Sequence, residues 1–464
     1  MADTLKENRV RPQPASRPFG GYEVVRSNNI DEELTLTDKG TPCGEYLRRF
    51  WQPLALSSQV SDLPFATRVL GEDLVVFRTR AGKLGVLHKQ CSHRGASLEF
   101  GLISDEGIRC GYHGWHFATD GRILDVPAET KPGSYARRIC HGAYPVLEYK
   151  GIIFGYLGPP DEKPDFPVYD FMDAVDEDCV PYCWPLDCNW LQVRENTQDP
   201  IHLTFLHSMF SIKQFGANLA NAIPYIRAHV TPIGQVTTSL RRLGDIYYIR
   251  INEMIMPNVA RVPDALREGR AIPNNEADAV GTGNETKALK YKRLVPSSHG
   301  MGLSMWVVPN DNENSMFFGW HHVPKDEPQA VRDERIRQVE HGQTRDRPYH
   351  ERQRNPGDYD VIASQGRIVA RDNDKLTSAD LGVGVYRRQL REGIRTVAQN
   401  GKPKGLDVAR QAPIPTYAYA LVRPAPPLGS DAEEAERVAR LEQEIVADLL
   451  SFRLPHTPRT LESV

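Results

Sequence analysis

Two short segments, each with one cysteine and one histidine, limit most strongly what this chain can form. The first contains Cys91 and His93, the second contains Cys110 and His113, and sixteen residues separate His93 from Cys110. Two thiolates and two imidazoles on a pair of loops can hold two irons and two sulfides, with the cysteines on one iron and the histidines on the other. Structural zinc also accepts such a set, but zinc knuckles usually pair cysteine with cysteine and histidine with histidine. The mixed pairs therefore favour an iron–sulfur cluster.

Glycines flank these four candidate ligands, at positions 95, 111 and 114. Glycine has no Cβ, so its backbone can approach a sulfide closely. The strings His93-Arg-Gly-Ala-Ser-Leu98 and Gly111-Tyr-His-Gly-Trp-His-Phe117 resemble the Rieske domain of aromatic-ring-hydroxylating oxygenases. Ser92 departs from the resemblance, because many relatives have proline there. Exchange of two thiolates for two imidazoles raises the reduction potential, so such a cluster can accept electrons from a ferredoxin or a reductase.

A second set of metal-ligand residues lies between Asn196 and His207. Two histidines, His202 and His207, form with one carboxylate the facial triad of non-haem Fe(II) oxygenases, which leaves coordination positions open for dioxygen and substrate. On a regular α-helix, residues five apart diverge by roughly 140°, so both histidines can bind one metal only where the helix ends or contains a π-bulge. The sequence therefore predicts a local distortion between them.

Asp199 lies three residues before His202 and has two interpretations. Because Pro200 follows it, Asp199 is suited to cap and begin a helix. Its carboxylate can also hydrogen-bond His202, since residues three apart are neighbours on a helix. The segment resembles the Asp-x-x-His-x4-His motif of Rieske oxygenases, and we place Asn196 and Asp199 among the catalytic residues. The resemblance implies that Asp199 connects His202 to His113 of a neighbouring subunit, where electrons would cross.

The third ligand of the mononuclear iron must come from elsewhere in the chain. In the phthalate-dioxygenase-like subgroup, which this chain resembles, an acid begins a helix that runs into a Ser-Gln or Gln-Gly pair. Asp358 falls at the matching position before Ser364 and Gln365. Asp360 is the alternative, and the helix dipole alone would favour either acid near a helix N-terminus. We predict Asp358 as the ligand.

Length and local pattern predict more than one domain. A chain of 464 residues exceeds what one hydrophobic core usually supports. Residues 1–48 are polar with scattered prolines and predict an N-terminal arm. Residues 49–158 alternate β-branched and aromatic runs with glycine-rich turns, which predicts an all-β Rieske domain. Residues 159–464 would form the mononuclear iron domain, which the resemblance implies is an antiparallel sheet gripping a helix. The predicted fold class is therefore α+β.

The C-terminal region predicts a packed helix. Ser430 and Glu433 have the spacing of a capping box. The apolar residues that follow recur at helical spacing: Val438, Leu441, Ile445 and Leu449.

Charge and missing motifs indicate which partners to expect. A net charge of −3 and a pI near 6.5 argue against nucleic-acid binding. The chain has no apolar stretch of membrane-spanning length and no signal-peptide pattern at its start, so we expect a cytoplasmic protein without a membrane contact. The sequence also lacks the Gly-x-Gly-x-x-Gly motif of a nicotinamide site and the cysteine spacing of a second, ferredoxin-type cluster. We therefore expect a separate NAD(P)H-dependent reductase, with or without a ferredoxin. The resemblance implies a homo-oligomer, a trimer or a multiple of one.

The sequence says least about the substrate. Four arginines could clamp an aromatic carboxylate, although a surface charge is the commoner role for each alone: Arg227, Arg241, Arg242 and Arg250. The resemblance implies an aromatic acid or aryl ether. The predicted function is thus a Rieske oxygenase with a 2Fe-2S cluster and a mononuclear Fe(II), which dihydroxylates an aromatic substrate with dioxygen. A monooxygenase or O-demethylase is the alternative, followed by a non-catalytic Rieske electron-transfer protein, which would need no second iron site.

Overall fold

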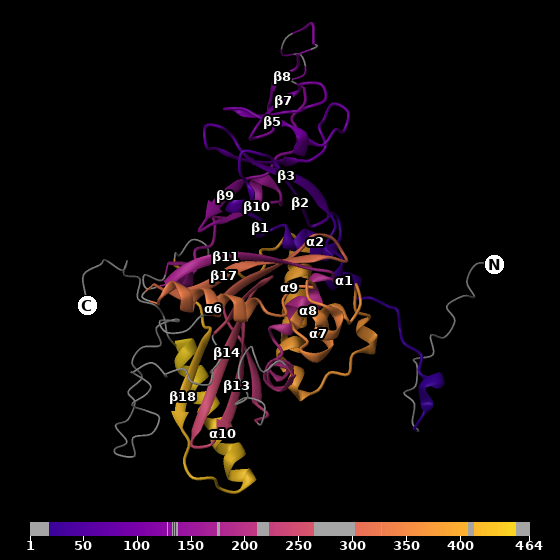
Figure 1. Ribbon diagram of the computed structural model, residues 1–464. Coiled ribbons are helices and arrows are strands. Elements are labelled where there is room, and N and C mark those ends of the chain that lie inside the picture. The colour runs from indigo at the N-terminus through magenta and orange to yellow at the C-terminus, as the bar shows by residue number, and fades with distance from the viewer. Residues whose placement is uncertain are drawn as a thin grey trace, which may run out of the picture.

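The computed structural model describes residues 18–451, except residues 128, 132, 134, 136, 137, 174–176, 211–221, 264–301, 326 and 407–412. Part of the predicted arm, residues 1–17, therefore lies outside the described residues. Figure 1 shows several small sheets stacked on one end of a larger body that contains the long strands and most helices. The combination of antiparallel sheets with separate helices confirms the predicted α+β class.

Three small antiparallel sheets form from the segment with the Cys-His pairs, in the strand orders β1-β10-β9, β2-β3-β4 and β5-β6-β7-β8. Apolar side chains from the second and third sheets surround Cys91 and Cys110 in one buried cluster. The strands are β1 (Trp51–Leu56), β2 (Phe65–Val69), β3 (Glu72–Arg78), β4 (Leu84–His88), β5 (Leu102–Ile103), β6 (Gly107–Arg109), β7 (His116–Ala118), β8 (Ile123–Asp125), β9 (Val146–Tyr149) and β10 (Ile152–Tyr156).

The larger body is built on one eight-stranded antiparallel sheet, in the order β11-β17-β16-β15-β14-β13-β12, with β18 also paired to β14. Its long central strands are buried along almost their whole length, since other elements cover both faces. The strands are β11 (Glu177–Leu186), β12 (Tyr225–Val230), β13 (Gly234–Leu243), β14 (Ile246–Ile255), β15 (Val259–Val262), β16 (Leu303–Pro309), β17 (Ser315–Pro324) and β18 (Tyr419–Pro424).

Helices cover the two faces of this sheet and fill the space beside it. They are α1 (Glu32–Thr35), α2 (Pro42–Leu47), α3 (Trp190–Asn196), α6 (Gln329–Glu340), α7 (Tyr349–Arg354), α8 (Asp358–Ala363), α9 (Leu381–Ala398) and α10 (Asp431–Ser451). Short 3-10 turns are η1 (Gly20–Glu23), η2 (Ser57–Gln59), η3 (Leu98–Phe100), η4 (Pro160–Glu162), η5 (Asp170–Asp173), η8 (Arg371–Asn373) and η9 (Ser378–Asp380). Within the described ranges, no helix has the length and apolar character of a membrane span.

The two faces of the sheet have different partners. On what we call the outer face, Val236 and Ile251 share a buried cluster with Ile445 of α10. The capping box predicted for α10 is present, because the Ser430 backbone N–H donates to Glu433 Oε2 at 2.8 Å and Ser430 Oγ accepts from the Glu433 N–H at 3.4 Å. The predicted C-terminal helix is thus confirmed.

On the opposite, inner face, polar residues of β13 contact the chain that follows α3. Gln235 Nε2 and Thr237 Oγ1 both donate to Gln198 Oε1, at 3.1 and 2.7 Å. Gln235 Nε2 also reaches the Gly382 carbonyl of α9, at 2.8 Å. All three side chains are fully buried. The inner face therefore fixes the end of α3, from which the segment with His202 and His207 continues.

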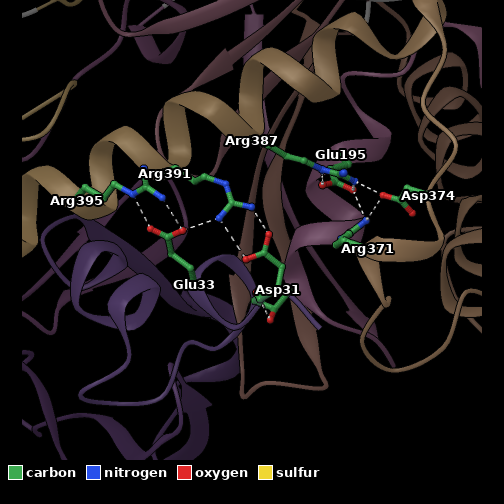
Figure 2. A network of polar contacts seen from close by, with 9 residues as sticks. Asp31, Glu33, Glu195, Arg371, Asp374, Arg387, Arg391 and Arg395 are labelled. Atoms are coloured by element: carbon green, nitrogen blue, oxygen red, sulfur yellow. Dashed lines mark hydrogen bonds and ion pairs between the residues drawn. The ribbon is translucent and has the colours of Figure 1, made fainter. Parts of the chain in front are cut away.

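Helix α9 connects α3 to the N-terminal segment through ion pairs, as Figure 2 shows. Arg395 Nε donates to Glu33 Oε1 at 2.9 Å, and Arg391 also binds Glu33. One turn earlier, Arg387 Nε donates to Glu195 Oε1 of α3 at 2.7 Å. Arg371 binds the other oxygen of Glu195 at 2.7 Å. This network fixes α3 to α9 and to the segment of Arg371.

The two glycines inside α9 should respond oppositely to alanine. A Cβ on Gly393 would approach the buried Tyr46 ring to 2.7 Å, whereas a Cβ on the exposed Gly384 would meet nothing within 4 Å. We expect Gly393→Ala to lower the free energy of unfolding by about 1–3 kcal/mol, because the ring must move. Gly384→Ala should raise it by roughly 0.5–1 kcal/mol, because alanine has less freedom in the unfolded chain. Thermal unfolding followed by circular dichroism measures both, and shifts of the same sign would contradict the tight contact.

Candidate metal centres

The two Cys-His segments fold into loops of the same shape. The Gly95 N–H donates to the Cys91 carbonyl at 2.9 Å, and the Gly114 N–H donates to the Cys110 carbonyl at 3.0 Å. Both glycines are left-handed, with φ of 74° and 76°. Glycine adopts this conformation without steric cost, so each loop can turn back at the fourth residue after its cysteine.

The thiols and the imidazoles occupy different depths in these loops. Cys91 and Cys110 are buried, whereas His93 is exposed and His113 is half-buried. The two imidazole rings lie 4.6 Å apart, and Trp115 stacks on His93 at 5.0 Å. Burial raises the pKa of the Cys91 thiol to about 11, and the neighbouring Cys110 adds to the shift. Thiolates at this place require a nearby positive charge, which bound iron would supply.

Ser92, the departure from the family pattern, anchors the first loop. Its hydroxyl lies 2.6 Å from Nδ1 of the buried His141, and Nε2 of that ring lies 2.8 Å from the His88 carbonyl. A carbonyl only accepts, so Nε2 has the proton and Nδ1 accepts from Ser92. Proline could not make this contact. The serine thus gives the loop a side-chain hydrogen bond in place of proline's rigidity.

The segment with His202 and His207 is distorted as predicted. Its residues Leu203–Phe210 (η6) form a π-helix. Hydrogen bonds in a π-helix run from residue i to i+5, so residues five apart lie close to the same face. The His202 and His207 rings accordingly lie 5.1 Å apart. The prediction of a local distortion here is confirmed.

The π-helix brings both histidines to Asp358 at the start of α8. Ligand atoms of these three residues all lie within 4.8 Å of one another, and no other cluster of this kind occurs in the described part of the chain. Asp358 Oδ1 lies 3.2 Å from His207 Nε2 and 3.9 Å from His202 Nε2. Two imidazoles and one carboxylate converging on a common point fit a single Fe(II).

Protonation in this cluster suits metal binding. Burial lowers the pKa of His202. Burial alone would raise the pKa of Asp358, but the His207 and His202 imidazoles and a hydrogen bond from Gln343 hold it well below its usual range. At neutral pH the site therefore offers a neutral imidazole and an ionised carboxylate, the forms that bind metals.

Asp360, the alternative third ligand, has other partners. Arg347 and Arg352 each donate to one of its oxygens at 2.5 Å. The Gly357 N–H also donates to it at 2.9 Å, as expected of a carboxylate that caps a helix. Both oxygens of Asp360 are thus occupied, while Asp358 faces the histidines.

Asp199 makes the predicted capping contact, whereas its carboxylate lies near His202 without a hydrogen bond to it. Its Oδ1 accepts from the Ile201 N–H at 3.0 Å, which is the capping contact. Its Oδ2 lies 3.8 Å from His202 Nδ1. That nitrogen also hydrogen-bonds the Asp199 backbone carbonyl, so it has the ring proton and Nε2 remains available for a metal. Asn196 Nδ2 donates to Asp358 Oδ1 at 3.3 Å, which places both predicted catalytic residues beside the cluster.

The structure separates the four candidate arginines into two groups. Arg227 is exposed and stacks on Tyr225. Arg242 pairs with Glu434 of α10, at 3.0 Å. Both therefore lie outside the inner face.

Arg241 and Arg250, by contrast, are buried on the inner face, on neighbouring strands. Arg241 donates to the Pro200 carbonyl at 3.0 Å and to Thr204 Oγ1 at 3.3 Å, both beside the histidine segment. Arg250 donates to the Pro263 carbonyl at 2.8 Å. Among the described residues, no carboxylate pairs with either guanidinium. These two buried cations thus lack an anionic partner within the described chain, and Arg241 lies beside the histidine segment.

Comparison with known proteins agrees with this geometry. Residues 50–145 match the model of the Rieske [2Fe-2S] domain. The chain is 39% identical over 399 residues to the tert-butanol monooxygenase / tert-amyl alcohol desaturase oxygenase subunit of Aquincola tertiaricarbonis, over 81% of this chain and 79% of the relative. It is 33% identical to the phenoxybenzoate dioxygenase subunit alpha of Ectopseudomonas oleovorans, over 81% of this chain and 87% of that one. A crystal structure of dicamba monooxygenase bound to 3,6-dichlorosalicylic acid shares the fold, with a TM-score of 0.57 at 15% identity, over 76% of this chain and 98% of the other.

The two acids of α8 offer a matched test of the iron site. We expect Asp358→Ala to lower mononuclear iron binding by more than about 100-fold, because loss of a supporting contact alone costs about 10–100-fold and this variant loses a ligand. Asp360→Ala should keep the iron, although it breaks the pairs with Arg347 and Arg352. Iron per protein, after correction for the cluster absorbance, measures both. Iron loss in the Asp360 variant alone would mean that the assignment is wrong by two residues.

Proposed function

Because this chain belongs to the Rieske non-haem iron oxygenases, in the phthalate-dioxygenase-like subgroup, we propose that it hydroxylates an aromatic carboxylic acid with the residues described above. As an oxygenase component it has a Rieske 2Fe-2S cluster and a mononuclear iron, and it receives electrons from a separate reductase. The first expectation drawn from its motifs, membership of this family, is confirmed. The assignment of single residues, the substrate and the assembly are our proposals.

In our proposal, Cys91 and Cys110 bind one iron of the cluster, and His93 and His113 bind the other. The cluster supplies electrons one at a time, and the mononuclear iron activates dioxygen. His202, His207 and Asp358 hold that second iron. The observation that carries this proposal is the convergence of these three ligand atoms within 4.8 Å.

The buried arginines Arg241 and Arg250 support an anionic substrate. Burial of an ion without a partner costs several kcal/mol, and among the described residues no carboxylate pairs with either guanidinium. Burial lowers the pKa of Arg241 to about 10, and the nearby Arg250 adds to the shift. A substrate carboxylate would remove this unfavourable arrangement and accept the planar guanidinium fork. We infer that the carboxylate binds at Arg250, because Arg241 already makes three hydrogen bonds within the chain.

We also propose a domain organisation and a subunit arrangement. Residues 1–48 would form an arm, 49–158 the Rieske domain and 159–464 the catalytic domain. The cluster and the mononuclear iron would meet across a subunit boundary in a homotrimer or a multiple of it. Asp199 supports this arrangement, because one of its oxygens caps the helix while the other remains half-exposed beside His202.

A substrate panel tests the proposed reaction. The protein would be supplied with a reductase, NADH and labelled dioxygen, and offered aromatic acids, their methyl esters and aryl ethers. We expect the acids to give a diol with both oxygens labelled, and the esters to react with at least about tenfold lower kcat/KM, because one charge-assisted contact is lost. Formaldehyde release would instead indicate O-demethylation, and a single labelled hydroxyl would indicate monooxygenation.

Two arginine variants serve as the control for this panel. Arg250→Met should remove the preference for the acid over its ester, while Arg227→Met, at an exposed position, should leave it unchanged. If Arg250→Met retains the preference, the carboxylate does not bind there. If neither acids nor ethers yield oxygenated products with the wild-type protein, the proposed substrate class is wrong.

Electron transfer to the mononuclear iron should depend on the Asp199 carboxylate. Asp199→Ser keeps a side-chain oxygen for the Ile201 N–H but removes the group that would reach His113 of a neighbouring subunit. We expect this variant to keep both metal centres and to oxidise its pre-reduced cluster about 10–100-fold more slowly in the presence of substrate and dioxygen. Stopped-flow absorbance of the cluster measures this rate. A wild-type rate in Asp199→Ser would leave Asp199 with only its capping role.

A further inference from the structure

We propose that Gln343 is a positioning residue that holds Asp358 so that only one carboxylate oxygen, Oδ1, faces the mononuclear iron. The inference rests on the proposed function, because it takes His202, His207 and Asp358 as the iron ligands. The inference adds Gln343 to the residues of the proposed iron site, although Gln343 belongs to no sequence motif and its amide side chain is not one of the proposed metal ligands. Its consequence is that the number of open coordination positions on the iron is set by a neutral amide.

The two oxygens of Asp358 have different surroundings. Oδ1 lies 3.2 Å from His207 Nε2 and 3.9 Å from His202 Nε2, so it shares the space between both imidazoles. Oδ2 accepts a hydrogen bond from Gln343 Nε2 at 2.7 Å. Asn196 also reaches Oδ1, but at the longer distance of 3.3 Å. The short contact thus lies on Oδ2, whereas Oδ1 is the oxygen nearest to both imidazoles.

Burial makes the amide contact a strong constraint. Gln343 and Asp358 are only 7% and 9% exposed, so solvent competes little for the carboxylate. A hydrogen bond to an ionised acceptor is about twice as strong as one between neutral groups, and its strength increases in a poorly solvated place. Asp358 therefore cannot bring both of its oxygens to the histidines without leaving the buried Gln343 amide unpaired.

A close backbone approach brings Gln343 to this position. A Cβ on Gly357 would lie only 2.3 Å from the Gly342 Cα, so both residues must lack a side chain. Gly342 has a positive φ of 83°. The Tyr359 N–H then donates to the Gly342 carbonyl at 3.1 Å, which joins the loop after α6 to the first turn of α8. The residue after Gly342 is thereby directed at the residue after Gly357, which is Asp358.

This geometry determines how the carboxylate can bind iron. A carboxylate that offers one oxygen occupies one coordination position, whereas two-oxygen binding occupies a second position that dioxygen or substrate would need. With Gln343 present, Oδ2 is engaged and Oδ1 alone faces the metal. Without the amide donor, Oδ2 becomes free to bind the iron as well. Loss of Gln343 should therefore reduce access of small molecules to the iron before it reduces iron content.

Nitric oxide, which binds open positions on ferrous iron, is the probe for this inference. The variants are Gln343→Met, which has similar length but no donor, and the control Gln338→Met on α6, whose amide donates to Glu334. With the cluster oxidised, we expect Gln343→Met to keep wild-type iron content, to bind nitric oxide about tenfold more weakly and to change the shape of the paramagnetic resonance signal. The control should match the wild type in all three. An unchanged signal and affinity at full iron content in Gln343→Met would overturn the inference.

A third variant covers the case in which Gln343→Met loses its iron. Gln343→His keeps a ring N–H donor, so we expect it to rebind Fe(II) at least about tenfold more tightly than Gln343→Met. Equal Fe(II) affinity in the two variants would mean that Gln343 only fills space. Failure of the wild-type protein to bind iron at His202, His207 and Asp358 would refute the proposed function itself. That failure is seen in the wild-type protein alone, so it can be distinguished from failure of the inference about Gln343.

Discussion

In our proposal two histidines five residues apart bind one metal, and a regular α-helix cannot point both of them at the same place. The π-helix of Leu203–Phe210 solves this geometry, although π-helices are rare and occur mostly as single turns inside α-helices. The surrounding chain donates hydrogen bonds to carbonyl groups in it and just before it. Arg241 on the inner face donates to the Pro200 carbonyl just before the distortion, and Ser208 Oγ donates to the Leu203 carbonyl within it. The sheet is therefore needed to keep the ligand-bearing segment in a form that its own backbone would not favour.

The third ligand approaches from a distant part of the chain, so its position depends on tertiary contacts. Asp358 begins α8, and Asp360 fixes that helix by accepting from Arg347 and Arg352. On the other side, Glu195 holds α3 to α9 through Arg387. Each of these ion pairs is largely shielded from solvent, where charge pairs with several hydrogen bonds resist separation. Three carboxylates thus have different roles. Asp360 and Glu195 fix helices, and Asp358 faces the histidines of the candidate iron site.

The sequence was most informative where chemistry requires a fixed spacing. The Cys-His pairs identified the Rieske domain, and the five-residue interval between His202 and His207 predicted a helical distortion that the structure contains. The order of acids before Ser364 also favoured Asp358, which is the one that faces the histidines. Gln343 could not be found in this way. A neutral amide has no characteristic spacing, and its contact depends on two glycines, Gly342 and Gly357, that meet only in the folded chain.

The arginines also could not be assigned from sequence. Successive side chains of a strand point to opposite faces of the sheet, so neighbouring arginines have different partners. Arg241 and Arg242 are adjacent, so they point to opposite faces. Arg242 pairs with Glu434 on the outer face, while Arg241 supports the histidine segment on the inner face. Arg250 shares the inner face with Arg241, and among the described residues its guanidinium donates to the Pro263 carbonyl. Under our proposal, a substitution at Arg250 should change substrate preference and spare the histidine segment, whereas the same substitution at Arg241 would also remove its contacts with Pro200 and Thr204.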